Sequence, residues 1–170
     1  WNTVYEAYYE QTGDPRIQWR MTTEVGDAAI DCCGNVPWYP QEKYLTPGED
    51  ITLSSGAEMR LVEAEALLRN NDLAGAMAKI NALRTAAGVP SVNAASITDG
   101  WTALKRERGI VLWLEGRRMG DLRRWLVEGT PGALDPLELP SGSADSGSHL
   151  VQQALCFPIP PGERDTNPNL

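Results

Sequence analysis

The sequence predicts a mainly α-helical fold with one helical hairpin and long irregular connections. Two observations support this prediction. Between residues 57 and 128, apolar residues recur at spacings of three and four, as on one face of a helix, whereas glycine and proline gather in residues 20–56 and 129–148. We therefore expect an aromatic, turn-rich irregular segment at 1–56 and a helical core region at 57–128. A flexible loop and a Pro-rich tail docked on the helices would form 129–170.

The first twelve residues are expected to form a short helix. Their aromatic side chains recur every four residues, at Trp1, Tyr5 and Tyr9, which places them on one helical face. The turn formers Gly13-Asp14-Pro15 then end the helix. Further along, Trp38-Tyr39 and Lys43-Tyr44-Leu45 are expected to form short extended pieces.

A helical hairpin is expected from about Ala57 to Gly88. Its first helix ends at Asn70-Asn71, and Asp72 is suited to cap the second helix. Small residues at Ala64 and Ala76 would let the two helix axes approach closely. The pair therefore resembles one tetratricopeptide-like hairpin.

A third helix is expected to start at Thr98 or Asp99 and to run to about Glu115, before glycines interrupt it. A shorter helix would then carry Asp121 to Leu126.

Charged residues fall on the apolar face of the third helix. Arg108 and Glu115 lie seven and fourteen positions after Trp101, and Trp101 begins that face. Buried charges are costly unless they are paired and hydrogen-bonded, so we expect a structural ion network there and no ligand contact. Of Glu63 and Glu65, two positions apart on a helix, one would pair with a buried arginine and the other would be solvated. The expected members are Glu63, Arg108, Glu115, Arg118, Asp121 and Arg124.

Composition excludes several classes of function. The chain of 170 residues has a formal net charge of −8, which argues against binding to nucleic-acid backbones. No run of apolar residues approaches the length of a membrane span. Nucleophile motifs, phosphate loops and metal-ligand spacings are absent, so we expect no enzyme activity, no cofactor and no metal. One disulfide from Cys32 or Cys33 to Cys156 remains open, because the sequence does not fix pairing.

Aromatic residues are the natural candidates for sugar binding, because a planar ring stacks on the apolar face of a pyranose. The tryptophans at 101, 113 and 125 lie in helical patterns and are expected in the core. In the turn-rich half, Pro37 and Pro40 flank Trp38 and Tyr39, which would hold these rings on a stiff loop. We expect ligand contacts from Trp38, Tyr39, Trp19 and Tyr8.

Several motifs, in order, resemble those of one protein family. Glu107-Arg108, an apolar run, and then Glu115-Gly-x-Arg-x-x-Asp-Leu-x-Arg124 resemble the C-terminal signature of the SusD/RagB family. Upstream, the segments similar to the family's motifs are Asp14-Pro15-Arg16, Lys43-Tyr44, Ala64-Glu65-Ala66 and Ile80-Asn81-Ala82-Leu83-Arg84. Downstream, they are Phe157-Pro158-Ile159-Pro160 with Glu163 and Asn167-Pro168-Asn169-Leu170.

The resemblance implies a SusD-like fold and noncatalytic glycan binding at the cell surface, in the outer membrane. It implies an oligosaccharide or other small nutrient as ligand and a SusC-like TonB-dependent transporter as partner. It also implies that this chain is the C-terminal portion of a larger lipoprotein, which contacts the membrane only through a lipid anchor outside this chain. A different reading remains open, in which the chain is a helical-repeat protein–protein interaction module without sugar binding.

Overall fold

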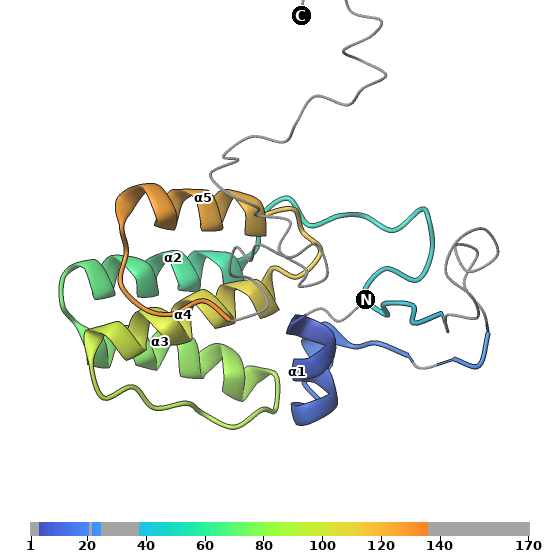
Figure 1. Cartoon of the computed structure of the whole chain (residues 1–170), viewed down its shortest axis with the longest axis horizontal. Coiled ribbons are helices and arrows are strands. Elements are labelled where there is room, and N and C mark those ends of the chain that lie inside the picture. The colour runs from blue at the N-terminus through green and yellow to red at the C-terminus, as the bar shows by residue number, and fades with distance from the viewer. Residues whose placement is uncertain (1–3, 21, 25–37, 136–170) are drawn as a thin grey trace, which may run out of the picture.

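The structure is a computed structural model that describes residues 4–20, 22–24 and 38–135. These residues form five α-helices and one turn of 3-10 helix, and no strand occurs among them, which confirms the mainly α prediction (Figure 1). In chain order the elements are α1 (Val4–Thr12), η1 (Pro15–Ile17), α2 (Gly56–Arg69), α3 (Leu73–Ala86), α4 (Ile97–Val111) and α5 (Arg118–Glu128).

The predicted hairpin consists of α2 and α3, which run antiparallel on one side of the molecule (Figure 1). The hydroxyl of Ser55 caps α2 by accepting a hydrogen bond from the Glu58 amide, at 3.1 Å. Asp72 caps α3 as the sequence predicts. Ala64 and Ala76 are both fully buried, so small side chains do lie where the two helices pack together.

The third helix, α4, differs from its prediction at both ends. It starts after Ser96, whose hydroxyl caps the helix by accepting from the Asp99 amide and also donates to the Asp99 carboxylate. The helix ends at Val111 because Leu114 and Gly116 adopt positive φ angles of 61° and 73°, which turn the chain. The fourth predicted helix is correspondingly longer: α5 begins at Arg118 and continues through Gly120 to Glu128.

Two hydrophobic clusters hold the helices together. The larger lies between α2, α3, α4 and α5 and contains Trp101 and Trp125, each 3% exposed. The smaller joins Ile17, Ile110 and Trp113, with three tyrosines of α1 and Trp19 packed against it. The three tryptophans predicted for the core are therefore buried. The smaller cluster packs α1 and η1 against α4.

A pair of irregular segments extends from η1. Residues 18–20 and 22–24 run against residues 38–42, and we call this unit the arm. An isolated antiparallel bridge links Trp19 and Gln41, and the Trp38 amide donates to the Glu24 carbonyl oxygen at 2.7 Å. Lys43 lies in a bend, and none of the residues at 38–39 or 43–45, where short extended pieces were expected, belongs to a regular strand.

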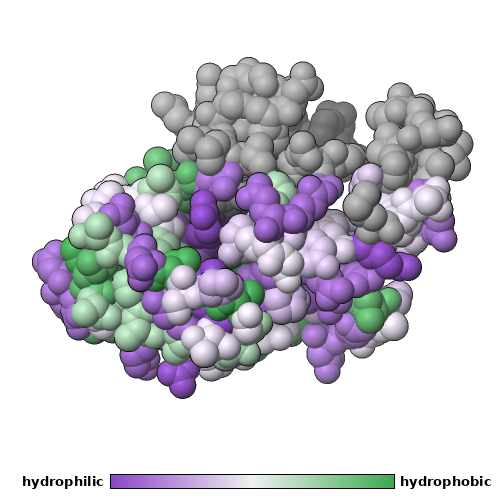
Figure 2. Space-filling view, turned by 90° about the horizontal axis from the view of Figure 1, so that it is seen from below, coloured by the Kyte–Doolittle hydropathy of each residue, from purple (hydrophilic) through white to green (hydrophobic). Residues whose placement is uncertain are grey.

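Several sequence predictions lie outside the described residues: the open disulfide among Cys32, Cys33 and Cys156, most of the flexible loop, and the docked Pro-rich tail. Within the part that the structure describes, no helix combines the length and apolar character needed to cross a membrane. On the face seen in Figure 2, hydrophilic residues are interspersed with smaller hydrophobic areas.

Candidate functional site

The four aromatic residues predicted to bind ligand lie in two places. Trp19, Trp38 and Tyr39 belong to the arm, where the backbone pairing of its two segments brings them together from distant parts of the sequence. Tyr8 lies apart from them, on α1.

Trp38 is the most accessible of these rings, with 47% of its surface exposed. Its backbone is held on both sides, because its amide donates to the Glu24 carbonyl and its carbonyl accepts from the Thr22 hydroxyl at 2.6 Å. Tyr39 beside it is half-buried. An exposed ring on a hydrogen-bonded backbone suits stacking on a ligand, because little conformational freedom is lost on binding.

Trp19 serves mainly to fasten the arm. Its ring is half-buried and lies 5.2 Å from the ring of Trp113, centroid to centroid, at an interplanar angle of 55°. Tilted aromatic pairs of this kind are attractive beyond the area they bury. The contact ties the arm to the turn that follows α4.

Tyr8 contacts a buried ion cluster centred on Glu107, which we call the Glu107 cluster. The carboxylate of Glu107 is 1% exposed and accepts hydrogen bonds from Arg16 of η1 and from Arg84 of α3, the latter at 3.0 Å. Arg16 also pairs with the fully buried Asp14, at 2.6 Å. The Tyr8 hydroxyl lies 3.4 Å from Arg84. The cluster therefore connects α1, η1, α3 and α4.

A second ion cluster, the Asp121 cluster, joins α4, α5 and α2. Arg108 donates two hydrogen bonds to Asp121, at 2.7 and 2.9 Å, and both residues are buried. Arg124 bridges Asp121 and Glu65, which also accepts from Arg69 at 2.9 Å. Such bidentate, charge-assisted pairs are the strong form of a buried ion pair. The predicted members Arg108, Asp121 and Arg124 therefore do form a structural network.

Glu63 was wrongly assigned to this network. Its side chain is 54% exposed and pairs with Lys79 at 2.6 Å, on the surface of the hairpin. Glu65 is the carboxylate that meets the buried arginines. The two residues point to different faces of α2, as their spacing requires.

Glu115 and Arg118 lie beside the Asp121 cluster, in other contacts. Because α4 ends before Glu115, this carboxylate is not on the helical face that its spacing suggested, and it pairs with Lys43 at 2.7 Å. Arg118 donates to the Lys105 carbonyl at 2.8 Å and lies over the ring of Trp125. Both contacts are structural, but the single network predicted from the sequence is divided.

The sequence reasoning assigned no role to the Glu107 cluster. Its four charged members, Asp14, Arg16, Arg84 and Glu107, are contributed by segments far apart in the chain. One signal was present: Glu107 and Arg108 are adjacent, so they point to different faces of a helix, and the apolar residues 110–113 follow them closely. From this pair one could have inferred that the helix is buried on two sides.

One carboxylate in each cluster, Glu65 and Asp14, has a lowered pKa. Burial alone would raise the pKa of Glu65, but hydrogen bonds from Arg124 and Arg69 outweigh it and lower that pKa below 4.5. The pKa of Asp14 is likewise lowered below 3.8, because the hydrogen bonds and charge of Arg16 outweigh the effect of burial. These carboxylates therefore act as fixed anions.

The carboxylates of the two clusters are engaged in ion pairs. The carboxylates of Glu107, Glu65 and Asp121 are all engaged by guanidinium groups. Across residues 4–20, 22–24 and 38–135, no three His, Cys, Asp or Glu side chains gather as a metal site would require.

Substitution of Glu107 tests the structural role of its cluster. Glu107→Gln keeps the shape of the side chain but leaves Arg84 without a buried counter-charge and Arg16 with Asp14 alone, so we expect a loss of about 3–5 kcal/mol in the free energy of unfolding. Urea denaturation measures this loss. The matched control is Glu63→Gln, which removes an exposed carboxylate and should leave the stability unchanged. Equal effects of the two substitutions would contradict the assignment.

The lowered pKa of Glu65 predicts how stability depends on pH. The unfolded chain binds a proton at Glu65 more readily than the folded chain, so the stabilisation is complete above about pH 4.5 and is lost as the pH falls further. We expect the free energy of unfolding, measured by urea denaturation from pH 6 to 3, to fall less steeply for Glu65→Gln than for the wild type. A slope as steep as that of the wild type would count against the Glu65–Arg124 pairing.

Comparison with known proteins places the chain. No curated protein and no solved structure matches it. Residues 56–170, more than half of the chain, match the model of the SusD family. The match includes α2 to α5 and the whole Asp121 cluster. Members of this family are noncatalytic proteins, typically associated with the outer membrane, that bind glycans or other nutrients at the cell surface. The chain belongs to the SusD family.

Proposed function

We propose that this chain binds an oligosaccharide at the cell surface, without catalysis, and delivers it to a SusC-like TonB-dependent transporter. Family membership supports the class of function. The observation that carries the proposal to particular residues is the exposed ring of Trp38, held on the arm between Glu24 and Thr22.

Recognition would combine stacking with hydrogen bonding. The ring of Trp38 offers a flat apolar face to a sugar, and Tyr39 adds a hydroxyl next to it in the chain. The helical residues offer less, since the tryptophans of α4 and α5 are buried in the core. The arm is therefore where we place the sugar.

Alanine replacement of Trp38 tests this placement. A stacking ring contributes roughly 1–3 kcal/mol by analogy with base–aromatic stacking, so Trp38→Ala should weaken glycan binding by that amount while the melting temperature stays close to that of the wild type. Binding is measured by calorimetry with a glycan identified on an array.

Two variants serve as controls for the loss of exposed apolar surface. Trp38→Phe keeps a stacking ring and should retain most of the affinity. Leu126→Ala removes an exposed side chain from α5, away from the arm, and should not change affinity. If the array finds no glycan at all, the helical-repeat interaction module becomes the better reading of the fold.

Delivery to a transporter is a separate step with its own test. We expect the protein to co-purify with a TonB-dependent barrel encoded by a neighbouring gene, and Trp38→Ala to leave that association intact. An association that depends on Trp38 would instead assign the arm to the partner protein.

A further inference from the structure

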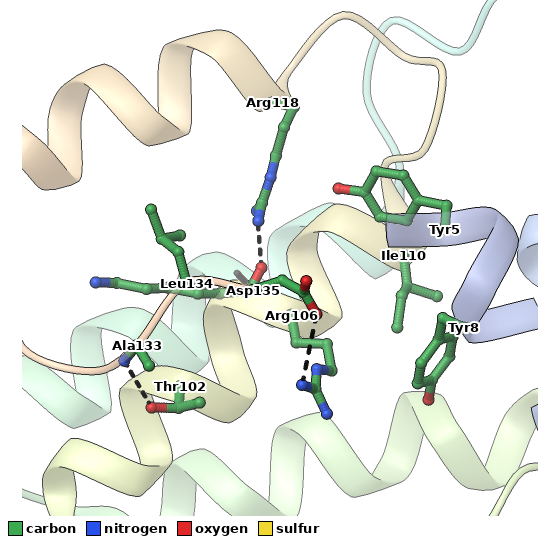
Figure 3. A pocket seen from close by; sticks show the side chains of 10 residues that line it. Tyr5, Tyr8, Thr102, Arg106, Ile110, Arg118, Ala133, Leu134 and Asp135 are labelled. Carbon is green, nitrogen blue, oxygen red and sulfur yellow. Dashed lines mark hydrogen bonds and ion pairs between the residues drawn. The ribbon is translucent and has the colours of Figure 1, made fainter. Parts of the chain in front are cut away.

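A pocket of about 270 Å³ lies between α1, α4 and the segment that follows α5, away from the arm (Figure 3). We propose that this pocket binds a small ring compound that carries a carboxylate. The proposal concerns a second site and does not depend on Trp38.

The shape of the pocket suits one ring. Tyr5 and Tyr8 of α1 lie on one side of the pocket, with Ile110 of α4 between them, and Ala133 and Leu134 lie on the other side (Figure 3). Aromatic and aliphatic walls with a few polar groups are typical of small-molecule sites. The volume of about 270 Å³ exceeds the roughly 150 Å³ of an engineered cavity that holds benzene, so one substituted ring fits.

The charge of the pocket selects an anion. Lys105, Arg106 and Arg118 line it, whereas Asp135 is the one acidic residue among its described lining residues. The lining therefore carries two more positive than negative charges, in a chain whose formal net charge is −8. Positive charge concentrated in a hollow with low-dielectric walls attracts anions.

Lys105 is a buried cation in the wall of the pocket. The residue is 4% exposed, and its ammonium group donates to the carbonyl oxygens of Thr130 and Gly132, at 3.2 and 3.0 Å, which carry no formal charge. Burial, together with the nearby charge of Arg118, lowers the pKa of Lys105. A bound carboxylate would offset both effects.

Two glycines let the walls of the pocket approach each other. A Cβ atom at Gly109 would lie 2.4 Å from the Tyr5 hydroxyl and 3.2 Å from Cζ of Arg118, so this glycine makes room for both groups. Gly132 has a φ of +88°, and a Cβ atom there would lie 2.7 Å from the Thr102 amide nitrogen. The tight crossing at Gly132 sets the following residues, which include Leu134 and Asp135, against α4.

Two kinds of compound share the required chemistry: a hexuronic acid and an aromatic carboxylic acid. The full chain is titrated by calorimetry with glucuronate and with benzoate, and with the uncharged methyl ester of each. We expect at least one acid to bind at least about tenfold more tightly than its ester, because the ester lacks the charge. The acid that binds shows whether the ligand is a hexuronic acid or an aromatic carboxylic acid. Binding of neither acid, or equal binding of acid and ester, overturns the proposal.

Two substitutions at the rim of the pocket, one removing a positive and one a negative charge, test whether binding is electrostatic. Arg106 and Asp135 form a loose ion pair there, at 3.9 Å, with side chains 57% and 24% exposed, so neither substitution removes a buried group. Arg106→Gln should weaken binding of the acid about fivefold, and Asp135→Asn should strengthen it by a similar factor. Arg60→Gln, at an exposed position on α2, is the matched control and should have no effect. Shifts of the same sign in Arg106→Gln and Asp135→Asn would contradict an electrostatic site.

The pocket and the arm can fail separately. Gly109→Ala should abolish binding of the acid by pushing Tyr5 or Arg118 into the pocket, and the melting temperature shows whether the variant folds. Glycan affinity measured through Trp38 should survive in a folded Gly109→Ala variant, and binding of the acid should survive in Trp38→Ala. If Trp38→Ala also removes binding of the acid, the pocket assignment is wrong.

Discussion

The position of every element before α2 depends on how the buried carboxylate of Glu107 is neutralised. This group lies on α4, nearly inaccessible to water, and an uncompensated charge there would cost several kcal/mol. Its two partners are Arg84, 23 residues away, and Arg16, 91 residues away. The chain must therefore bring η1 and α3 to the same side of α4. Because Tyr8 contacts Arg84, the orientation of α1 follows as well.

Hydrophobic packing alone would constrain these parts less. Apolar clusters tolerate changes in shape and small shifts, whereas a hydrogen-bonded ion pair has one favourable geometry. Asp14 and Arg16 lie just before the arm. The contact between Trp19 and Trp113 then holds the first residues of the arm against the turn after α4. The arm thus leaves the core in a fixed direction and presents Trp38 on a supported backbone. Preorganisation of this kind lowers the entropic cost of binding a ligand.

Local patterns predicted the helices well and the long-range contacts poorly. The hairpin, the Asp72 cap and the burial of Ala64 and Ala76 follow from spacings within one or two turns of helix. The assignment of Glu115 was wrong because it extended the helical spacing past Leu114, where a positive φ turns the chain. The Glu107 cluster could not be read from spacing, because its charged members come from three separate parts of the chain, around η1, on α3 and on α4. In the candidate site, the exposed ring of Trp38 was foreseen, whereas the pocket beside α1 was not.

The family match and most of the proposed ligand residues lie in different parts of the chain. The match covers residues 56–170, which hold the Asp121 cluster and the whole of the larger hydrophobic cluster. The arm and α1 lie before residue 56, and they contain the residues that we propose as ligand contacts: Trp38 for the sugar, and Tyr5 and Tyr8 for the pocket. The Glu107 cluster is what joins the two parts, since Arg16 comes from one and Arg84 from the other. The helical part would then provide a common scaffold, while the residues fastened to it by these ion pairs determine which ligand is bound.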